Sequence, residues 1–153
     1  MDDTKNLKSL DITLGLLSFG VGVVDGVCGS YGLVSTQMQY LLAAAPPVVQ
    51  GAINAAIGSI DALADGFRHR KGQEKIEISF VRNGLYSYSY HAPVSTKNNP
   101  LTIMDKMQIV LGASAVGGGI GCTYGASAGV AQTGSGILLG YSIGQWIRHM
   151  GGK

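Results

Sequence analysis

One serine lies in a pattern that hydrolases use for a nucleophile. Residues 125–129, GASAG, match G-x-S-x-G, in which a strained turn between a strand and a helix exposes the serine hydroxyl. Catalysis would also need a histidine and an acid. After Ser127 the chain has one histidine, His149, and no acidic residue. No strand pattern precedes the motif. We therefore do not predict a hydrolase.

Other side chains that could do chemistry are isolated. The histidines are scattered, with no second ligand at metal spacing: His69, His91 and His149. Asp61 and Asp65 share a helix face, but Arg68 one turn on makes a local ion pair the more ordinary interpretation. Residues 117–121, GGGIG, lack dinucleotide spacing. We predict no enzyme, no metal, and no small-molecule substrate.

The composition indicates a membrane protein. The chain has 153 residues and 24 glycines, is 46% apolar and is 13% charged. A disordered linker would be glycine-rich but not so apolar. The net charge of +2 is too small for nucleic-acid binding. The acidic start, MDDTKN, resembles neither a secretory signal nor a transit peptide.

Small residues recur every fourth position, which places them on one face of a helix. In lipid, such a face lets another backbone approach closely. Ala113 extends the longest row, and Ser18, Ser30, Ala55 and Ser59 extend others. The glycines that we predict to pack helices are Gly22, Gly26, Gly51, Gly117, Gly121, Gly125, Gly129, Gly136, Gly140 and Gly144.

The apolar segments predict an all-α membrane protein with four short glycine-rich transmembrane helices in two hairpins, forming one domain. Pro46-Pro47 should break any earlier helix, and the uncharged residues 131–135 should form a turn. The predicted helices cover residues 12–34, 48–66, 105–129 and 135–149.

Between the second and third helices, the period changes to two over residues 75–91. Isoleucine and phenylalanine alternate with polar residues, then tyrosine alternates with serine, and Asn83-Gly84 suits the tight turn between them. This pattern predicts a β-hairpin outside the bilayer. An isolated hairpin is marginal in water, so its tyrosine face should lie on a protein or on the membrane surface.

A few charges lie in or beside the predicted helices. A carboxylate in lipid is costly, so Asp25 should face a partner or a wet cavity, or be protonated or hydrogen-bonded to Ser30 or Tyr31. If the chain lines a path for another protein, Asp25 and Asp61 would form a polar groove. The candidates for lipid head-group contact are Arg68, Arg70, Lys71 and Arg148. The alternative is that these residues mark an ordinary solvated helix end.

The two cysteines, Cys28 and Cys122, should be buried small residues. Trp146 with Arg148 and His149 should anchor the last helix at the interface. Four crossings would put the N-terminal lead, the middle loop and the C-terminal tail, which hold all the basic residues, on one side. By the positive-inside rule that side is cytoplasm or matrix.

The second half of one family signature is an acid, six residues, a pair of small residues, three more residues and a glycine. Asp105, Gly112-Ala113 and Gly117 resemble it in type and spacing. The family comprises four-helix mitochondrial inner-membrane proteins, including translocase channel subunits and a respiratory complex I accessory subunit. Leu101 stands where the signature has arginine, and the 75–91 hairpin resembles an insertion. The family usually places its termini in the intermembrane space, against the charge rule, so the orientation stays open.

The resemblance implies a multi-pass mitochondrial inner-membrane protein. Our leading hypothesis is a non-catalytic accessory subunit of complex I that fastens neighbouring membrane subunits and anionic lipids. The alternatives are a translocase channel subunit and a self-assembling, pilin-like or ring-forming membrane subunit. We predict no cofactor other than a bound phospholipid such as cardiolipin.

Overall fold

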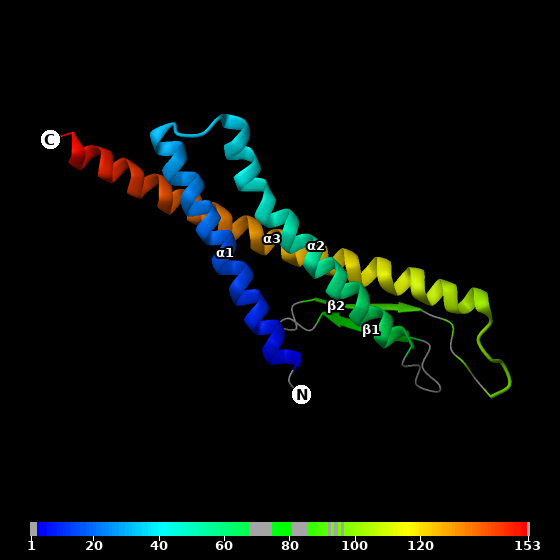
Figure 1. The fold of residues 1–153 in the computed structure, drawn as a ribbon. Helices are drawn as coiled ribbons and strands as arrows, with labels where there is room; N and C mark the ends of the chain where they lie inside the picture. The colour runs from blue at the N-terminus through cyan, green and yellow to red at the C-terminus, as the bar shows by residue number, and fades with distance from the viewer. Residues whose placement is uncertain are drawn as a thin grey trace. The chain divides into compact units, whose positions relative to one another are not determined.

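The computed structural model describes residues 3–67, 75–80, 86–91, 93, 95 and 97–152. Its helices are α1 (Asp3–Tyr31), α2 (Thr36–Phe67) and α3 (Ile103–Gly151), and its strands are β1 (Lys75–Phe80) and β2 (Tyr86–His91) (Figure 1). The prediction of four helices is therefore wrong, because the described chain has three.

The first correction concerns the proline pair. We expected Pro46-Pro47 to end a turn and the next helix to begin at residue 48, but α2 begins at Thr36 and runs through both prolines. A proline inside a helix removes one hydrogen bond, yet membrane helices tolerate it when a neighbour packs on the site. Here the α3 backbone comes close, since a Cβ on Gly129 would lie 2.6 Å from Pro47 Cα.

The second correction concerns residues 131–135, which we expected to be a turn between two helices. They are helical, so the predicted helices 105–129 and 135–149 are one helix, α3. The segment AQTGS contains no proline, and its hydroxyls bond within the helix, as Ser135 Oγ does to Ala131 O at 2.7 Å. Its glycine weakens a helix by only about 1 kcal/mol, which does not end it.

The turn between α1 and α2 is fixed by local hydrogen bonds. Gly32 has a φ of 64°, the left-handed conformation in which glycine commonly ends helices. The N–H of Leu33 donates to Cys28 O at 3.0 Å, and that of Gly32 to Gly29 O at 3.2 Å. Ser35 then caps α2, since its Oγ accepts from the Met38 N–H at 3.3 Å. α1 and α2 are thus separate helices.

The start of α3 is a reciprocal capping box. The N–H of Asp105 donates to Thr102 Oγ1 at 3.2 Å, and the N–H of Thr102 donates to Asp105 Oδ2 at 2.9 Å. Asp105, which resembles the acid of the family signature, therefore has a local task at the helix end.

The two strands pair antiparallel, with Lys75 opposite His91 and Phe80 opposite Tyr86. The expected turn, Asn83-Gly84, lies outside the described residues.

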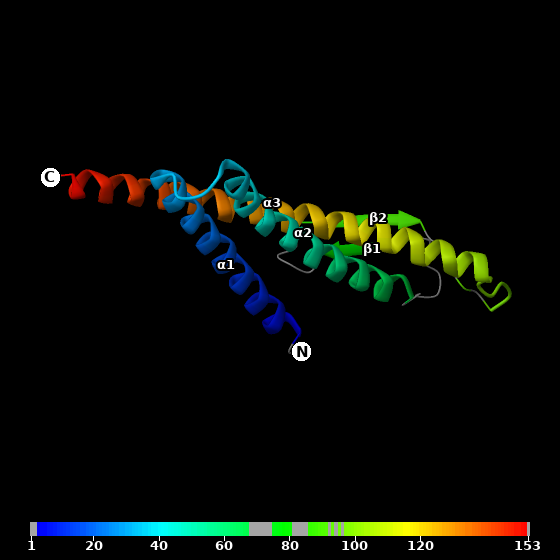
Figure 2. The same ribbon diagram turned by 45° about the horizontal axis from the view of Figure 1, so that its top comes forward.

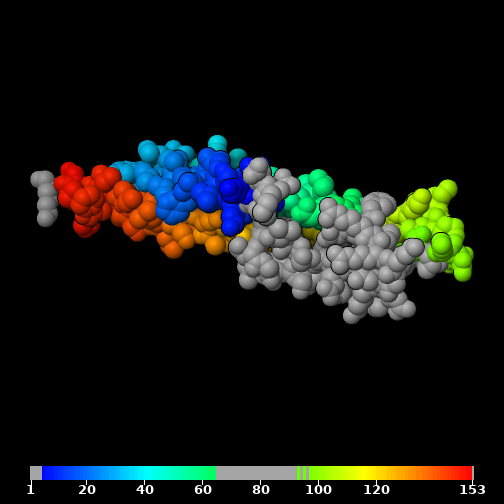
Figure 3. Space-filling model, turned by 90° about the horizontal axis from the view of Figure 1, so that it is seen from below, coloured from blue at the N-terminus to red at the C-terminus, as the bar shows by residue number. Residues whose placement is uncertain are grey.

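The chain packs as two compact units. Unit 1 comprises residues 1–52 and 125–153, and unit 2 comprises residues 53–124. In unit 1, α1 and the C-terminal part of α3 run in the same direction, because Gly22 meets Thr133 and Gly26 meets Ile137. Figures 2 and 3 show α1, in blue, lying against the orange part of α3. In unit 2, α2 and α3 run in opposite directions: Asn54 meets Gly121 and Gly58 meets Gly117.

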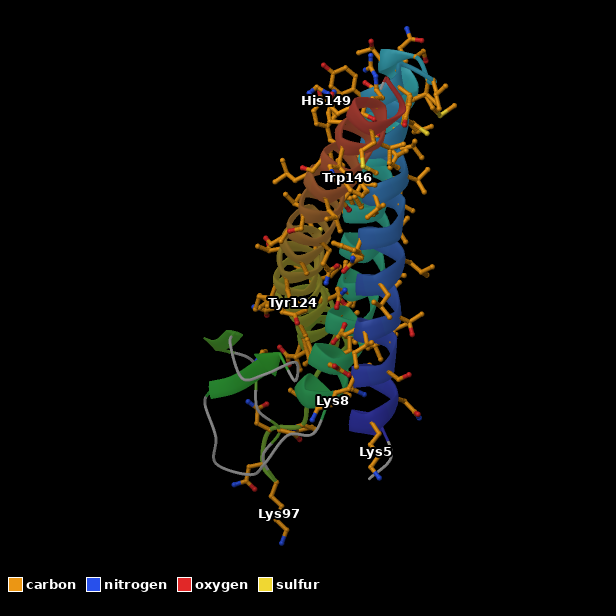
Figure 4. All side chains as sticks on the ribbon, turned by 90° about the vertical axis from the view of Figure 1, so that its left-hand side faces the viewer. Lys5, Lys8, Lys97, Tyr124, Trp146 and His149 are labelled. Atoms are coloured by element: carbon orange, nitrogen blue, oxygen red, sulfur yellow. The ribbon has the colours of Figure 1, made fainter. Side chains whose placement is uncertain are left out.

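All three helices are long and apolar enough to cross a membrane: Lys5–Tyr31, Thr36–Ala64 and Ile103–Gly151. At 1.5 Å per residue, α1 is about 44 Å long and α3 roughly 70 Å, against about 30 Å of hydrocarbon. These features are those of a multi-pass membrane protein. The basic residues of unit 1 lie at both of its ends, with Lys5 and Lys8 at one end and Arg148 at the other (Figure 4). Three crossings therefore do not place all basic residues on one side of the membrane, as four crossings would.

Candidate functional site

The buried residues of α3 form one continuous row. They step by four from Ile109 to Thr133, then by three, then by four again: Ile109, Ala113, Gly117, Gly121, Gly125, Gly129, Thr133, Gly136, Gly140 and Gly144. Thr133 connects the two glycine rows that the sequence presented separately. The row is continuous because the helix is.

In unit 1, backbone meets backbone from both sides. A Cβ added to Gly22 or Gly26 of α1 would overlap a carbonyl oxygen of α3, that of Thr133 or Ile137. Conversely, a Cβ on Gly136 or Gly140 of α3 would overlap the carbonyl oxygen of Phe19 or Val23 of α1. At Gly144 the close neighbour is a side chain instead, because its added Cβ would overlap the Ser30 hydroxyl oxygen. No larger residue fits these positions without a shift of the helices.

In unit 2, the same row meets α2. A Cβ on Gly117 would overlap the carbonyl oxygen of Gly58, and one on Gly121 that of Asn54. Ser59 Oγ also donates to Ser114 O at 3.1 Å. Gly51 of α2 and Gly125 of α3 are both buried in unit 1.

A buried amide joins all three helices in unit 1. Gln50 of α2 is 4% exposed, and its Nε2 donates to Ser18 Oγ of α1 at 2.6 Å and to Gln132 Oε1 of α3 at 2.6 Å. The Leu14 carbonyl of α1 is 3.4 Å away. Within an apolar interior an unpaired amide would be costly, so these bonds fix the register of the three helices.

Asp25 lies further along the same face of α1 and is 5% exposed. Its Oδ1 has no hydrogen-bond partner among the described residues. Ser30 Oγ donates to Val27 O at 2.7 Å, so its hydroxyl does not donate to Asp25. Protonation of Asp25, the other alternative, stays a prediction. Thr133 Oγ1, 2% exposed, is the other buried side-chain oxygen there without a partner.

Arg148 closes one end of unit 1. Its Nη1 donates to Ser30 O at 2.6 Å, and its guanidinium carbon is 5.9 Å from the centre of the Tyr31 ring. A cation there suits the negative end of the α1 dipole. Figure 4 shows Trp146 and His149 at this end, and Lys5 and Lys8 at the other end of α1.

The remaining predicted residues do not join this cluster. Asp61 is half-buried in unit 2. Ser127 is exposed and lies in the interior of α3. A hydrolase would instead place its serine on a turn between a strand and a helix. The predicted basic lipid contacts in the middle loop lie outside the described residues: Arg68, Arg70 and Lys71.

The cysteines differ from each other. Cys28 is half-buried, but Cys122 is exposed, so the prediction that both are buried is wrong for Cys122. It follows Gly121 directly and therefore points away from the row. Across the described residues, no group of three histidine, cysteine or acidic side chains could hold a metal ion.

Sequence reasoning missed Gln50, Gln132 and Thr133. A signal existed for Thr133, which lies four residues after Gly129 and so continues its row. Gln50 directly precedes Gly51 in an uncharged apolar stretch. A single amide there does not recur at any spacing, so the sequence does not predict its role.

Comparison of this chain with protein-family models, curated proteins and solved structures found no match in any of the three.

Proposed function

We propose that this protein is a non-catalytic, multi-pass membrane subunit that fastens neighbouring membrane subunits and lipids. One observation carries the proposal: the small residues face inward and the large apolar residues face outward, the reverse of a water-soluble core. Among the most exposed side chains are Leu16 at 67%, Val48 at 68% and Leu138 at 72%, one on each helix.

These outward side chains suit lipid tails or other membrane helices. A contiguous apolar surface of this kind on a soluble monomer would be an aggregation hazard. Because α1 and α2 occupy the row of α3, the contacts with neighbours must use the larger outward residues. The self-assembly alternative, which relies on free glycine rows, loses its support from this arrangement.

The translocase alternative needs an open polar groove. Asp25 is enclosed rather than exposed along a groove in unit 1, so this observation favours the fastening proposal over the translocase one.

The narrower proposal is an accessory subunit of respiratory complex I in the mitochondrial inner membrane, with anionic lipid such as cardiolipin as a bound partner. It is supported by the partial signature formed by Asp105, Gly112-Ala113 and Gly117. The capping role of Asp105 and the three-helix fold both count against it.

Blue-native electrophoresis of native membranes tests the proposal and its narrower form. A fastening subunit should migrate within a large heteromeric complex, and co-migration with complex I would support the narrower form. Migration as a homopolymer, or as a free monomer, would contradict the fastening function. As a matched pair, Leu138→Ser on the outward face should release the protein from its complex, whereas Ser142→Ala, also exposed on α3, should not.

A further inference from the structure

The buried polar groups of unit 1 follow one face of α1. Ser18, Gly22 and Asp25 are four and three residues apart, a spacing that keeps them on one side of the helix. From Ser18 to Asp25 the rise is about 10 Å, roughly a third of the hydrocarbon thickness. We call Ser18, Asp25, Gln50, Gln132 and Thr133 the polar column.

The column contains satisfied and unsatisfied groups. Ser18, Gln50 and Gln132 are linked by the two hydrogen bonds of 2.6 Å. Asp25 Oδ1 and Thr133 Oγ1 lack partners within the described residues, although both side chains are more than nine-tenths buried. Thr133 lies opposite Gly22, one turn before Asp25. Buried unsatisfied oxygens call for an explanation, usually a water, an ion or a proton.

No basic side chain of unit 1 neutralises Asp25 in the described structure. On α1, the other charged groups with described side chains are Lys5, Lys8 and Asp11 near its start, about four turns or more away. The unit 1 part of α2, residues 36–52, has only Tyr40 as an ionisable residue. On the unit 1 part of α3 the ionisable residues are Tyr141, Arg148 and His149. Arg148 donates to Ser30 O, and His149 is exposed.

A lone carboxylate in an apolar interior neutralises rather than stay charged. A hard metal cation would require six or more oxygen ligands, whereas a proton requires one. We propose that Asp25 is a proton-binding site inside unit 1, where its carboxylate takes up one proton to become the neutral acid and releases it again.

The test uses the full-length chain in lipid nanodiscs and dicyclohexylcarbodiimide, an apolar reagent that adds to protonated carboxyl groups. Peptide mass mapping locates the adduct. Asp25 should be labelled, and labelling should fall about tenfold per pH unit above its midpoint. Asp105, held as a cap at the start of α3, is the internal control and should stay unlabelled. Asp25→Asn should remove the adduct.

Two outcomes would overturn the proposal. One is an unlabelled Asp25 in the folded protein between about pH 5 and pH 9, with labelling appearing once the chain is unfolded in detergent. The other is labelling that sodium chloride suppresses and choline chloride does not, which would mean a metal cation rather than a proton.

The Asp25→Asn variant is the matched control, because its amide has the shape of the acid and takes up no proton in this pH range. Circular dichroism would verify folding. The result does not depend on whether the protein fastens a complex.

Discussion

Units 1 and 2 share the small-residue row of α3 but enclose different groups beside it. Among the described residues, the fully buried apolar side chains in the core lie in unit 2, namely Ala62, Ile109 and Ala113. Most buried polar side chains lie in unit 1, namely Ser18, Asp25, Ser30, Gln50 and Thr133, whereas unit 2 has Asn54.

The difference follows from the number of helices that meet. Unit 2 packs α2 on α3, while in unit 1 segments of α1, α2 and α3 meet at Gln50. A third helix supplies both the cover and the hydrogen-bond partners that a buried amide needs. Close backbone contact therefore sets the helix spacing in both units, whereas side-chain polarity adds register in unit 1.

The largest expected effect is on the shared row. Gly121→Ala would place a methyl group on the Asn54 carbonyl oxygen, and we expect a loss of about 2–3 kcal/mol in the free energy of unfolding. Gly119→Ala is the matched control on the same helix, since nothing lies within 4 Å of its added Cβ. That variant should gain up to about 1 kcal/mol from helix propensity.

Detergent unfolding followed by circular dichroism would measure both variants. Gly136→Ala, in unit 1, should behave like Gly121→Ala, because its Cβ would overlap the Phe19 carbonyl oxygen. Equal stability of the Gly121 and Gly119 variants would show that the row does not set the packing.

Loss of the buried Gln50 amide should destabilise unit 1. Gln50→Leu would leave Ser18 and Gln132 without their shared partner, at a cost of about 1–2 kcal/mol. Gln37→Leu, exposed on the same helix, should change the unfolding free energy by less than about 0.5 kcal/mol. If both glutamine variants unfold alike, the amide does not hold the three helices in register.

These predictions also show what the sequence could reveal. The four-residue spacing of Gly117 to Gly129 indicated a packing face, since spacing on a helix is a local property. Pro46-Pro47 misled because helix-breaking rules come from water, whereas in α2 the packing of Gly129 on Pro47 compensates. The polar column could not be predicted, because Gln50 and Ser18 are 32 positions apart and meet only after folding.

The smallest expected effect concerns a helix end in unit 2. Thr102→Ala removes the hydroxyl that accepts the Asp105 N–H, and we expect a loss of about 1 kcal/mol. Thr123→Ala is the control, because that hydroxyl bonds within α3 to Gly119 O at 2.9 Å and caps nothing. Hydrogen exchange of the first turn of α3 should rise in the Thr102 variant only. Equal exchange in both variants would show that Thr102 does not cap the helix.

Three crossings put the two ends of the chain on opposite sides of the membrane, so labelling from one side tests the number of crossings. Cysteines would replace Lys5 and His149, at opposite ends of unit 1, in a protein whose Cys28 and Cys122 are changed to serine (Figure 4). A membrane-impermeant maleimide added to sealed vesicles should label one position before permeabilisation and the other only afterwards. Labelling of both positions from the same side would contradict the three-helix account.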